Sequence, residues 1–390
     1  MTSAARTTAV VGAAALAAGM GVGRFAYTPI LPVMHAEVGL SAQLGSVLAT
    51  ANYVGYLLGA LAGIAVPALV RSRTALRVSL LVLTATLALM PATRDGAAWF
   101  ALRLIAGIAS ALVFVIVVSA LLAALRGHGE HLIGWAMGGV GGGIALSGGL
   151  VLARHGTWQQ AWWLMAALCL VLLIPAWFLP TDTEAPPAAS PDRDRTGPRW
   201  FSALLAAYTL EGVGYIIAGT FLVAAIDQGS PAWVGTSAWV LVGLAALPSS
   251  ALWAWLSHIW SRPTLLIAAT GVQAVGMALP AVRGGVGTAL VSAALFGATF
   301  LGIGTIVLAA GAHLRTPRAV AILTTGYSVG QIVGPVLVTP LLHNGYHQAL
   351  LVGAAIAALA AVAGGLLRYR FPHHLGPLPV RVRAALSDSV

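Results

Sequence analysis

The 390-residue chain is 59% hydrophobic and only 8% charged, a composition that excludes soluble globular proteins and is typical of a protein that spans a membrane many times. Its net charge of +10 would suit a nucleic-acid-binding protein, but all 20 basic residues are Arg and most lie in short loops between apolar runs. We therefore expect the positive charge to set the orientation in the lipid bilayer, and we expect no nucleic-acid partner.

A transmembrane helix needs about 20 predominantly apolar residues. On this basis the sequence predicts twelve spans, over residues 7–33, 42–70, 75–92, 97–125, 131–153, 158–179, 200–226, 232–257, 264–282, 286–312, 319–342 and 348–370. The first apolar run follows Arg6 as it would in a signal peptide, but it continues to Leu31, which is too long for a signal-peptide core. We therefore predict an uncleaved first span.

One segment interrupts the apolar pattern, at residues 181–199, where four Pro residues and several charges occur. We predict that this segment is a cytoplasmic linker that joins two six-helix halves. The predicted domains are thus an N-terminal half (1–180), the linker (181–199), a C-terminal half (200–371) and a basic cytoplasmic tail (372–390).

Arg residues are distributed unevenly between the two sides that these spans define. Fifteen lie in segments on the side of both termini, and three lie on the opposite side, at Arg94, Arg154 and Arg283. Because the cytoplasmic loops of membrane proteins carry an excess of Lys and Arg, this bias predicts that both termini are cytoplasmic.

The two predicted halves repeat several glycine positions. Gly21–Arg24 reads Gly-Val-Gly-Arg and Gly212–Tyr215 reads Gly-Val-Gly-Tyr, so Arg24 aligns with Tyr215. Further glycines align at a nearly constant offset of 188 to 191 residues: Gly107 with Gly297, Gly138 with Gly326, and Gly142 with Gly330. Each match alone is weak evidence, but the constant offset predicts an internal repeat and a transporter built from two related halves.

Six plus six spans with a central loop resemble the major facilitator superfamily of transporters. Residues 23–32 (Gly-Arg-Phe-Ala-Tyr-Thr-Pro-Ile-Leu-Pro) are similar to the first-span signature of its YbfB/YjiJ-type branch, and residues 211–223 and 330–335 are similar to that branch's seventh and eleventh spans. The resemblance implies an all-α membrane protein with twelve transmembrane helices in two six-helix halves, the major facilitator fold. It also implies a multi-pass protein of the bacterial inner membrane whose central cavity is lined by spans 1, 4, 7 and 10, and we expect a monomer.

The chain departs from the wider superfamily at two motifs. The loop after the second span keeps Gly63 and its Arg residues but lacks the acidic residue that is usual there. The fifth span has Ala145, Leu146 and Ser147 where antiporters of the superfamily carry a Gly-Pro pair. These departures weaken any inference of a charge-relay gate at that loop or of export by exchange.

Glu211 is the acidic residue that the sequence places near the middle of a span, whereas the other nine lie in loops, tails or helix ends, as do all ten His residues. A buried carboxyl group near an Arg can take up and release a proton near neutral pH. We therefore predict that Glu211 carries a coupling proton. The alternative is a structural carboxylate that accepts hydrogen bonds from Tyr hydroxyls and never titrates.

Two Arg residues, Arg24 and Arg103, lie within spans of the N-terminal half, where no intramembrane acid accompanies them. Buried cations are costly unless a counter-charge is present. Glu211 could neutralise one, and an anionic substrate the other, because Arg binds carboxylates through two parallel hydrogen bonds. Two alternatives remain open: Arg103 extends to the outer surface, and Arg24 bonds permanently to backbone carbonyls.

Polar side chains at helical spacing form stripes on three spans. Tyr208, Glu211 and Tyr215 share one helical face, and shorter stripes occur in the second and eleventh spans. Such stripes point into a cavity, or they hold helices together by hydrogen bonds. The predicted substrate-binding or translocation residues are Arg24, Tyr27, Asn52, Tyr53, Arg103, Tyr215, Tyr327 and Gln331.

The sequence contains no Lys, and hence no phosphate-binding loop, and it contains no metal-binding or nucleophile motif. We therefore expect neither an enzyme nor a bound cofactor or metal. We predict a secondary transporter that moves a small organic anion or zwitterion together with protons, by alternating access to a site near the membrane midplane. The alternatives are a proton-driven exporter of amphipathic or weakly basic compounds and a transport-inactive membrane sensor.

Overall fold

The computed structural model describes residues 3–125, 131–154, 156–181, 198–314, 316, 319–369 and 371. Within these residues all regular secondary structure is helical, which confirms the predicted all-α fold. Residues 182–197 of the predicted linker and the whole predicted tail, 372–390, lie outside the described residues.

Helices follow one another through short connections in both parts of the chain. Those before the linker are α1 (Ser3–Leu16), the π-helical η1 (Ala17–Val22), α2 (Tyr27–Val38), α3 (Ala42–Ala65), α4 (Pro67–Val70), α5 (Arg73–Leu89), η2 (Met90–Ala92), α6 (Gly96–Ala124), α7 (His131–Met137), α8 (Gly139–Arg154) and α9 (Trp158–Ala176). Those after it are α10 (Pro198–Gln228), α11 (Ala232–Ala246), α12 (Ser249–Leu256), α13 (Arg262–Val282), α14 (Val286–His313), α15 (Ala319–Val338), η3 (Thr339–Asn344) and α16 (His347–Arg368).

In the described part of the chain, 11 helices are long and apolar enough to cross a membrane, and a bent pair makes up to 12. The bent pair is α11 and α12, which meet at an angle of 43°. The span predicted over 232–257 is therefore present as a bent pair of helices. Pro248 lies at the bend, where its ring and its missing N–H prevent a regular helix.

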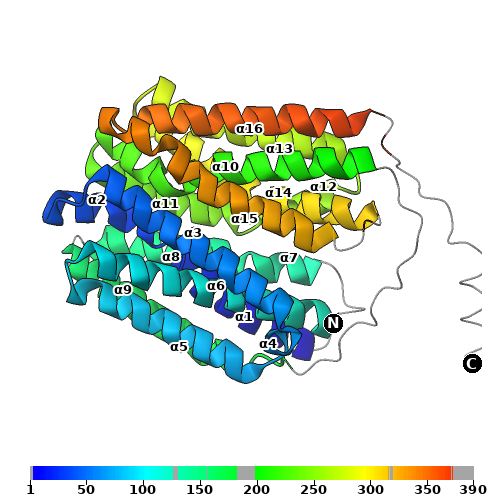
Figure 1. The fold of residues 1–390 in the computed structure, drawn as a ribbon, viewed down its shortest axis with the longest axis horizontal. Coiled ribbons are helices and arrows are strands. Elements are labelled where there is room, and N and C mark those ends of the chain that lie inside the picture. The colour runs from blue at the N-terminus through cyan, green and yellow to red at the C-terminus, as the bar shows by residue number, and fades with distance from the viewer. Residues whose placement is uncertain are drawn as a thin grey trace, which may run out of the picture.

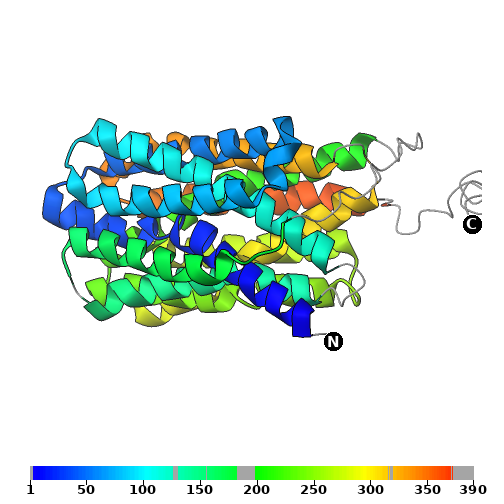
Figure 2. The ribbon, with the colours of Figure 1, turned by 90° about the horizontal axis from the view of Figure 1, so that it is seen from below.

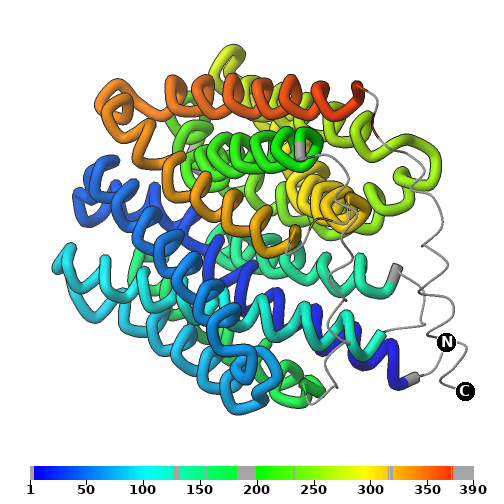
Figure 3. The backbone as a smooth tube through the Cα atoms, turned by 45° about the vertical axis from the view of Figure 1, so that its right-hand side comes forward, coloured from blue at the N-terminus to red at the C-terminus, as the bar shows by residue number. Residues whose placement is uncertain are grey.

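The helices run along the long axis of the molecule (Figure 1 and Figure 2). Figure 3 shows the N-terminal half, in blue to blue-green, beside the C-terminal half, in green to red. The start of α1 and the end of α16 lie at the same end of the bundle. We call this the Arg-rich end, because the helix order places Arg6, Arg71, Arg73, Arg77, Arg199, Arg262 and Arg368 there, and the opposite end the Arg-poor end, which holds Arg94, Arg154 and Arg283.

Equivalent glycines pack in the same way in the two halves. A Cβ atom on Gly107 would lie 2.1 Å from the carbonyl oxygen of Asn52, and one on Gly297 would lie 2.3 Å from that of Val242. Gly107 and Gly297 are 190 residues apart, as are their contacts Asn52 and Val242. The fourth span therefore packs on the second as the tenth packs on the eighth. These contacts require glycine, because any side chain would strike the backbone of the neighbouring helix.

The two halves meet in part through backbone rather than long side chains. Along the α8–α11 contact, a Cβ on Gly138 would lie 2.3 Å from the Leu247 carbonyl oxygen, and one on Gly243 would lie 2.3 Å from the Ala145 nitrogen. Small residues let helices approach closely without interlocking side chains. The surface between the halves is therefore smooth at this contact.

Candidate functional site

The first span is irregular at its centre, between α1 and α2. In η1 and the turn that follows it, the N–H groups of Gly23 and Phe25 bond to carbonyls five residues back, those of Ala18 and Met20. This register leaves the Gly19 carbonyl without its usual helical donor. Irregular backbone at membrane depth is tolerated only where other groups satisfy it, and π-helical turns occur frequently at functional sites.

Two side chains of α6 satisfy carbonyls of this irregular segment. The Ser110 hydroxyl donates to the Gly19 carbonyl at 2.7 Å, and Nη2 of Arg103 donates to the Arg24 carbonyl at 3.4 Å. The fourth span therefore holds the first span in its broken form. As a result, the Arg24 side chain leaves the backbone at the break itself.

Arg24 is 3% exposed and lies between the two halves. Its Nη2 donates to Oε1 of Gln331 on α15 at 2.6 Å, which joins the first span to the eleventh. The guanidinium also lies over the rings of Tyr56 and Tyr53, at 4.1 and 5.1 Å from their centroids. Nε of Arg24 has no hydrogen-bond partner, so a buried cation is held here by a neutral amide and aromatic faces.

Arg103 is 2% exposed, so the alternative in which it extends to the outer surface is wrong. Its guanidinium lies over the ring of Tyr27, 4.8 Å from the centroid. Nε and Nη1 of Arg103 have no partner among the described residues. The N-terminal half thus contributes two buried guanidinium groups with unused N–H donors.

Glu211 lies on α10 in the C-terminal half and is 1% exposed. Neither carboxylate oxygen accepts a hydrogen bond of normal geometry, although the Gln273 amide interacts with the group from α13. The expected neutralisation of Arg24 or Arg103 by Glu211 is absent, because no ion pair joins these described residues. No Tyr hydroxyl of the described residues donates a hydrogen bond to Glu211 either, so the alternative of a carboxylate held by Tyr hydroxyls is not observed.

Tyr215 connects the cationic and acidic parts of the site. Nε2 of Gln331 donates to the Tyr215 hydroxyl at 3.4 Å, which extends the contact from Arg24 through Gln331 onto α10. Tyr215 is one helical turn from Glu211 and within electrostatic reach of both Glu211 and Arg24. The structure therefore brings Arg24, Gln331 and Tyr215 together at the interface between the halves.

Several predicted residues have local partners beside this cluster. The Tyr53 hydroxyl shares a 2.7 Å hydrogen bond with Thr220 of the other half. The Tyr27 hydroxyl donates to the Gly45 carbonyl, and Nδ2 of Asn52 donates to the Arg103 carbonyl in the α3–α6 contact. Tyr327 stacks on Tyr215, with ring centroids 5.5 Å apart.

A set of contacts that the sequence did not predict joins the halves on the Arg-poor side of Arg24. Thr28 donates to the Gly219 carbonyl at 2.5 Å, and the Ser46 hydroxyl donates to the Pro335 carbonyl at 3.1 Å and lies 2.8 Å from the Thr339 hydroxyl. The sequence does contain a signal for the Thr28–Gly219 contact. Thr28 and Gly219 are 191 residues apart, which is the repeat offset, so they occupy equivalent positions in the two halves.

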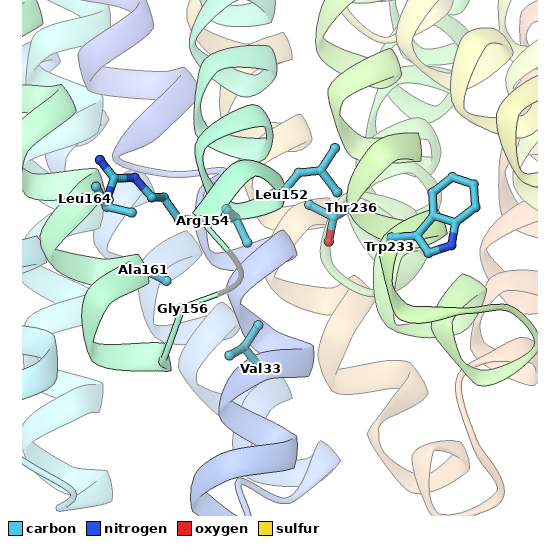
Figure 4. Close-up of a pocket in the computed structure, with 9 residues that line it drawn as sticks. Val33, Leu152, Arg154, Gly156, Ala161, Leu164, Trp233 and Thr236 are labelled. Carbon is cyan, nitrogen blue, oxygen red and sulfur yellow. The ribbon is translucent and has the colours of Figure 1, made fainter.

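A separate cavity of about 140 Å³ lies at the Arg-poor end, and Arg24 is not among the residues that line it (Figure 4). Figure 4 shows Arg154 of α8 and Trp233 of α11 on opposite sides of it. Its walls are mainly apolar, and Arg154 is the single charged residue that lines it. Among the described residues, no three His, Cys, Asp or Glu side chains are grouped so that they could hold a metal ion.

Twelve candidate spans in two related halves, with buried charges at their interface, define a membrane transporter of the major facilitator type. The model of a family described as "Uncharacterised MFS-type transporter YbfB" matches residues 16–364, so the chain belongs to this family. The resemblance of the first, seventh and eleventh spans to this branch is thereby confirmed, and the protein is a transporter rather than an enzyme.

A solved structure with the same fold is that of a mutant of the nucleoside transporter NupG. The TM-score is 0.69 at 14% sequence identity, over 92% of this chain and 100% of that chain. At this identity the likeness establishes the fold alone. No curated protein matches the sequence.

Proposed function

We propose that the protein is a secondary active transporter that moves a small organic anion or zwitterion together with protons. The observation that carries the proposal is the environment of Arg24, a buried cation between the halves whose partner, Gln331, is neutral. A buried cation without a counter-charge is costly, so an arriving carboxylate would be strongly favoured. Arg103, whose Nε and Nη1 have no hydrogen-bond partner among the described residues, offers a second donor set close by.

The distribution of charge provides a reason for proton coupling. Arg24 and Arg103 belong to the N-terminal half, and Glu211 belongs to the C-terminal half, where no cation pairs with its carboxylate among the described residues. When Glu211 is ionised, its field partly balances the two cations. When Glu211 is protonated, that balance is lost, and an anion takes its place. Proton and anion binding therefore favour each other, which is the thermodynamic requirement for symport.

Alternating access is supported by the placement of the contacts between the halves. The hydrogen bonds that join described residues of the two halves all lie between Arg24 and the Arg-poor end. We infer that these bonds break when the site opens toward that end. The smooth α8–α11 contact would let one half tilt against the other around the site.

We further propose that the Arg-rich end faces the cytoplasm and that the transporter works as a monomer. Reporter fusions after residues 190 and 390 should both report a cytoplasmic location, because the excess of Arg near these positions opposes translocation. A periplasmic signal from either fusion would contradict the proposed orientation.

The role of Arg24 is tested by uptake of organic anions into proteoliposomes with an imposed pH gradient. Arg24→Ala should reduce uptake at least about 30-fold, since truncation of one partner of a buried charge pair costs about 2–5 kcal/mol. Arg24→Lys should retain part of the activity, because Lys keeps the charge but loses the bidentate geometry. The exposed Arg94→Ala variant is the matched control and should behave as the wild type. Uptake that is unchanged in Arg24→Ala would exclude this role.

The second candidate is a proton-driven exporter of weakly basic compounds. It is favoured by Glu211, a buried carboxylate within electrostatic reach of Tyr208, Tyr215 and Tyr327, whose aromatic faces can attract an organic cation. The same proteoliposomes separate the two functions. Export of an organic cation that depends on Glu211 and is unaffected by Arg24→Ala would favour the exporter.

A further inference from the structure

Three aromatic rings of the C-terminal half form a nearly parallel column, in the order Tyr208, Tyr327 and Tyr215. Successive centroids are 4.4 and 5.5 Å apart, with interplanar angles of 17° and 14°. The rings of Phe300 and Phe296 lie beside the Tyr215 end of this column, 5.4 and 6.3 Å from Tyr215 and 6.2 Å from each other, and remain within 14° of parallel. The rings come from three helices, α10, α14 and α15, so no single helical repeat explains their alignment.

The Tyr215 end of this column lies next to the cationic centre. Tyr215 accepts the hydrogen bond from Gln331, and Gln331 in turn accepts from Arg24. On the other side, Phe25, which follows Arg24 in the chain, packs edge-on against Phe300 with centroids 5.6 Å apart. A ligand that reaches the column from Arg24 would therefore meet ring faces within about one side-chain length.

We propose that the substrate is a planar aromatic carboxylate, an inference that rests on the transport function proposed above and names its substrate class. The carboxylate binds the Arg24 guanidinium in place of Gln331, with Arg103 as a further donor. The aromatic ring inserts into the column beside Tyr215 and Tyr327. Each ring–ring contact that is opened is replaced by a ring–ligand contact of the same kind, so a flat ligand enters at little cost.

The same geometry disfavours other ligand types. A saturated ring is too thick to lie between parallel faces and has no π-system to stack. A neutral aromatic compound leaves the unused donors of Arg24 and Arg103 unpaired. An organic cation would be repelled by two guanidinium groups, and the faces of Tyr53 and Tyr56 are already occupied by Arg24.

The test is equilibrium binding of three probes to the purified full-length protein in lipid nanodiscs. The probes are benzoate, cyclohexanecarboxylate, which keeps the charge and loses the flat ring, and benzamide, which keeps the ring and loses the charge. We expect benzoate to bind about tenfold more tightly than cyclohexanecarboxylate, because only the flat ring stacks on two neighbouring rings. We expect a preference of at least the same size over benzamide, because benzamide has no charge to pair with Arg24.

Two variants at Tyr327, which contacts both Tyr208 and Tyr215, assign the preference to the column. Tyr327→Leu removes the ring and should bring the benzoate-to-cyclohexanecarboxylate affinity ratio close to one. Tyr327→Phe keeps the ring, loses the hydroxyl and should preserve the ratio. A preference that persists in Tyr327→Leu would overturn the proposal, even if benzoate binds well.

The outcomes for the wild type separate this inference from the proposed transport function. Equal binding of benzoate and cyclohexanecarboxylate, both abolished by Arg24→Ala, overturns the aromatic substrate class and leaves anion transport standing. Equal binding of benzoate and benzamide overturns the role of Arg24 in both proposals. Absence of benzoate binding, together with Arg24-dependent uptake of an aliphatic carboxylate, overturns the aromatic class alone.

Discussion

The first and seventh spans contain the same Gly-Val-Gly sequence and yet differ in backbone and in charge. In the first span, Gly21–Arg24 lies in a π-helical segment and a turn, and the motif ends in a cation. In the seventh, Gly212–Tyr215 lies inside the continuous helix α10, follows the acidic Glu211 and ends in an aromatic residue. The first copy has an additional glycine, Gly19, which lowers helix propensity further.

This difference shows how two related halves can divide the work of a single site. Both copies pack alike, because a Cβ on Gly21 would lie 2.6 Å from the Val140 carbonyl oxygen and one on Gly212 would lie 2.6 Å from that of Tyr327. Shared packing keeps the halves equivalent as scaffolds. The residues beside the glycines then provide a cationic face on one half and an acidic, aromatic face on the other.

The sharpest division between the halves concerns Glu211, because the N-terminal half has no acid at the equivalent depth. Glu211→Gln resembles the protonated carboxyl group in shape and cannot release a proton, so it should abolish accumulation driven by a pH gradient. Substrate counterflow, which needs no net proton movement, should remain. Accumulation and counterflow are both measured in proteoliposomes once a substrate is known. Glu211→Asp, which keeps a carboxylate, should retain partial activity.

A purely structural role for Glu211 makes a different prediction. With a structural role, Glu211→Gln should lose stability and be expressed at a lower level. Counterflow and gradient-driven accumulation should then fall together. Continued accumulation by Glu211→Gln in response to the gradient would show that the coupling proton is carried elsewhere.

The backbone difference between the two copies depends on Ser110, which satisfies the Gly19 carbonyl in the first span. Ser110→Ala should destabilise the protein by about 1–3 kcal/mol, since a buried acceptor loses its partner. It should also weaken substrate binding, because Arg24 is no longer held at the break. Thermal unfolding in detergent measures the first effect. The matched control is Ser147→Ala, whose hydroxyl donates only to the Ile144 carbonyl of its own helix. Equal losses in the two variants would argue against a special role for the break.

The smallest expected effect concerns the contact between equivalent positions, Thr28 and Gly219. Thr28→Val keeps the side-chain shape and removes the hydroxyl, which should cost about 1 kcal/mol and shift the population open toward the Arg-poor end about fivefold. Spin labels on the exposed Ala36 and Asn344 would report the distance between the halves there. The control is Thr86→Val, whose hydroxyl donates to Leu83 of the same helix. An unchanged distance distribution in Thr28→Val would exclude this contact as a gate.

Much of the fold could be predicted because span length and glycine spacing are direct consequences of the bilayer and of close helix packing. The twelve predicted spans agree closely with the helices, and Gly107 and Gly297, matched by offset alone, occupy equivalent contacts. The bend between α11 and α12 lies at Pro248, a residue type that can kink a helix, although the apolar pattern continues across it without interruption. Hydropathy measures how apolar a segment is and contains no information on its straightness.

The candidate site was only partly predictable. Arg24, Arg103 and Glu211 stand out because charge is rare in apolar spans, and all three are buried in the structure. The aromatic column and the two Phe rings beside it could not be predicted, because they converge from α10, α14 and α15 and an isolated Phe in an apolar helix gives no signal. The break in the first span was missed because its cause lies partly in the fourth span, at Ser110.

The dependence of the first span on α6 has a consequence for biosynthesis. Arg24 enters the membrane before residue 103 has been translated, so the carbonyls of Gly19 and Arg24 then lack the donors that satisfy them in the finished protein. In lipid, such carbonyls favour a regular helix. The nascent first span is therefore expected to insert as a continuous helix and to rearrange when the fourth span docks. Gln331 arrives 307 residues after Arg24, so the site is completed only near the end of translation.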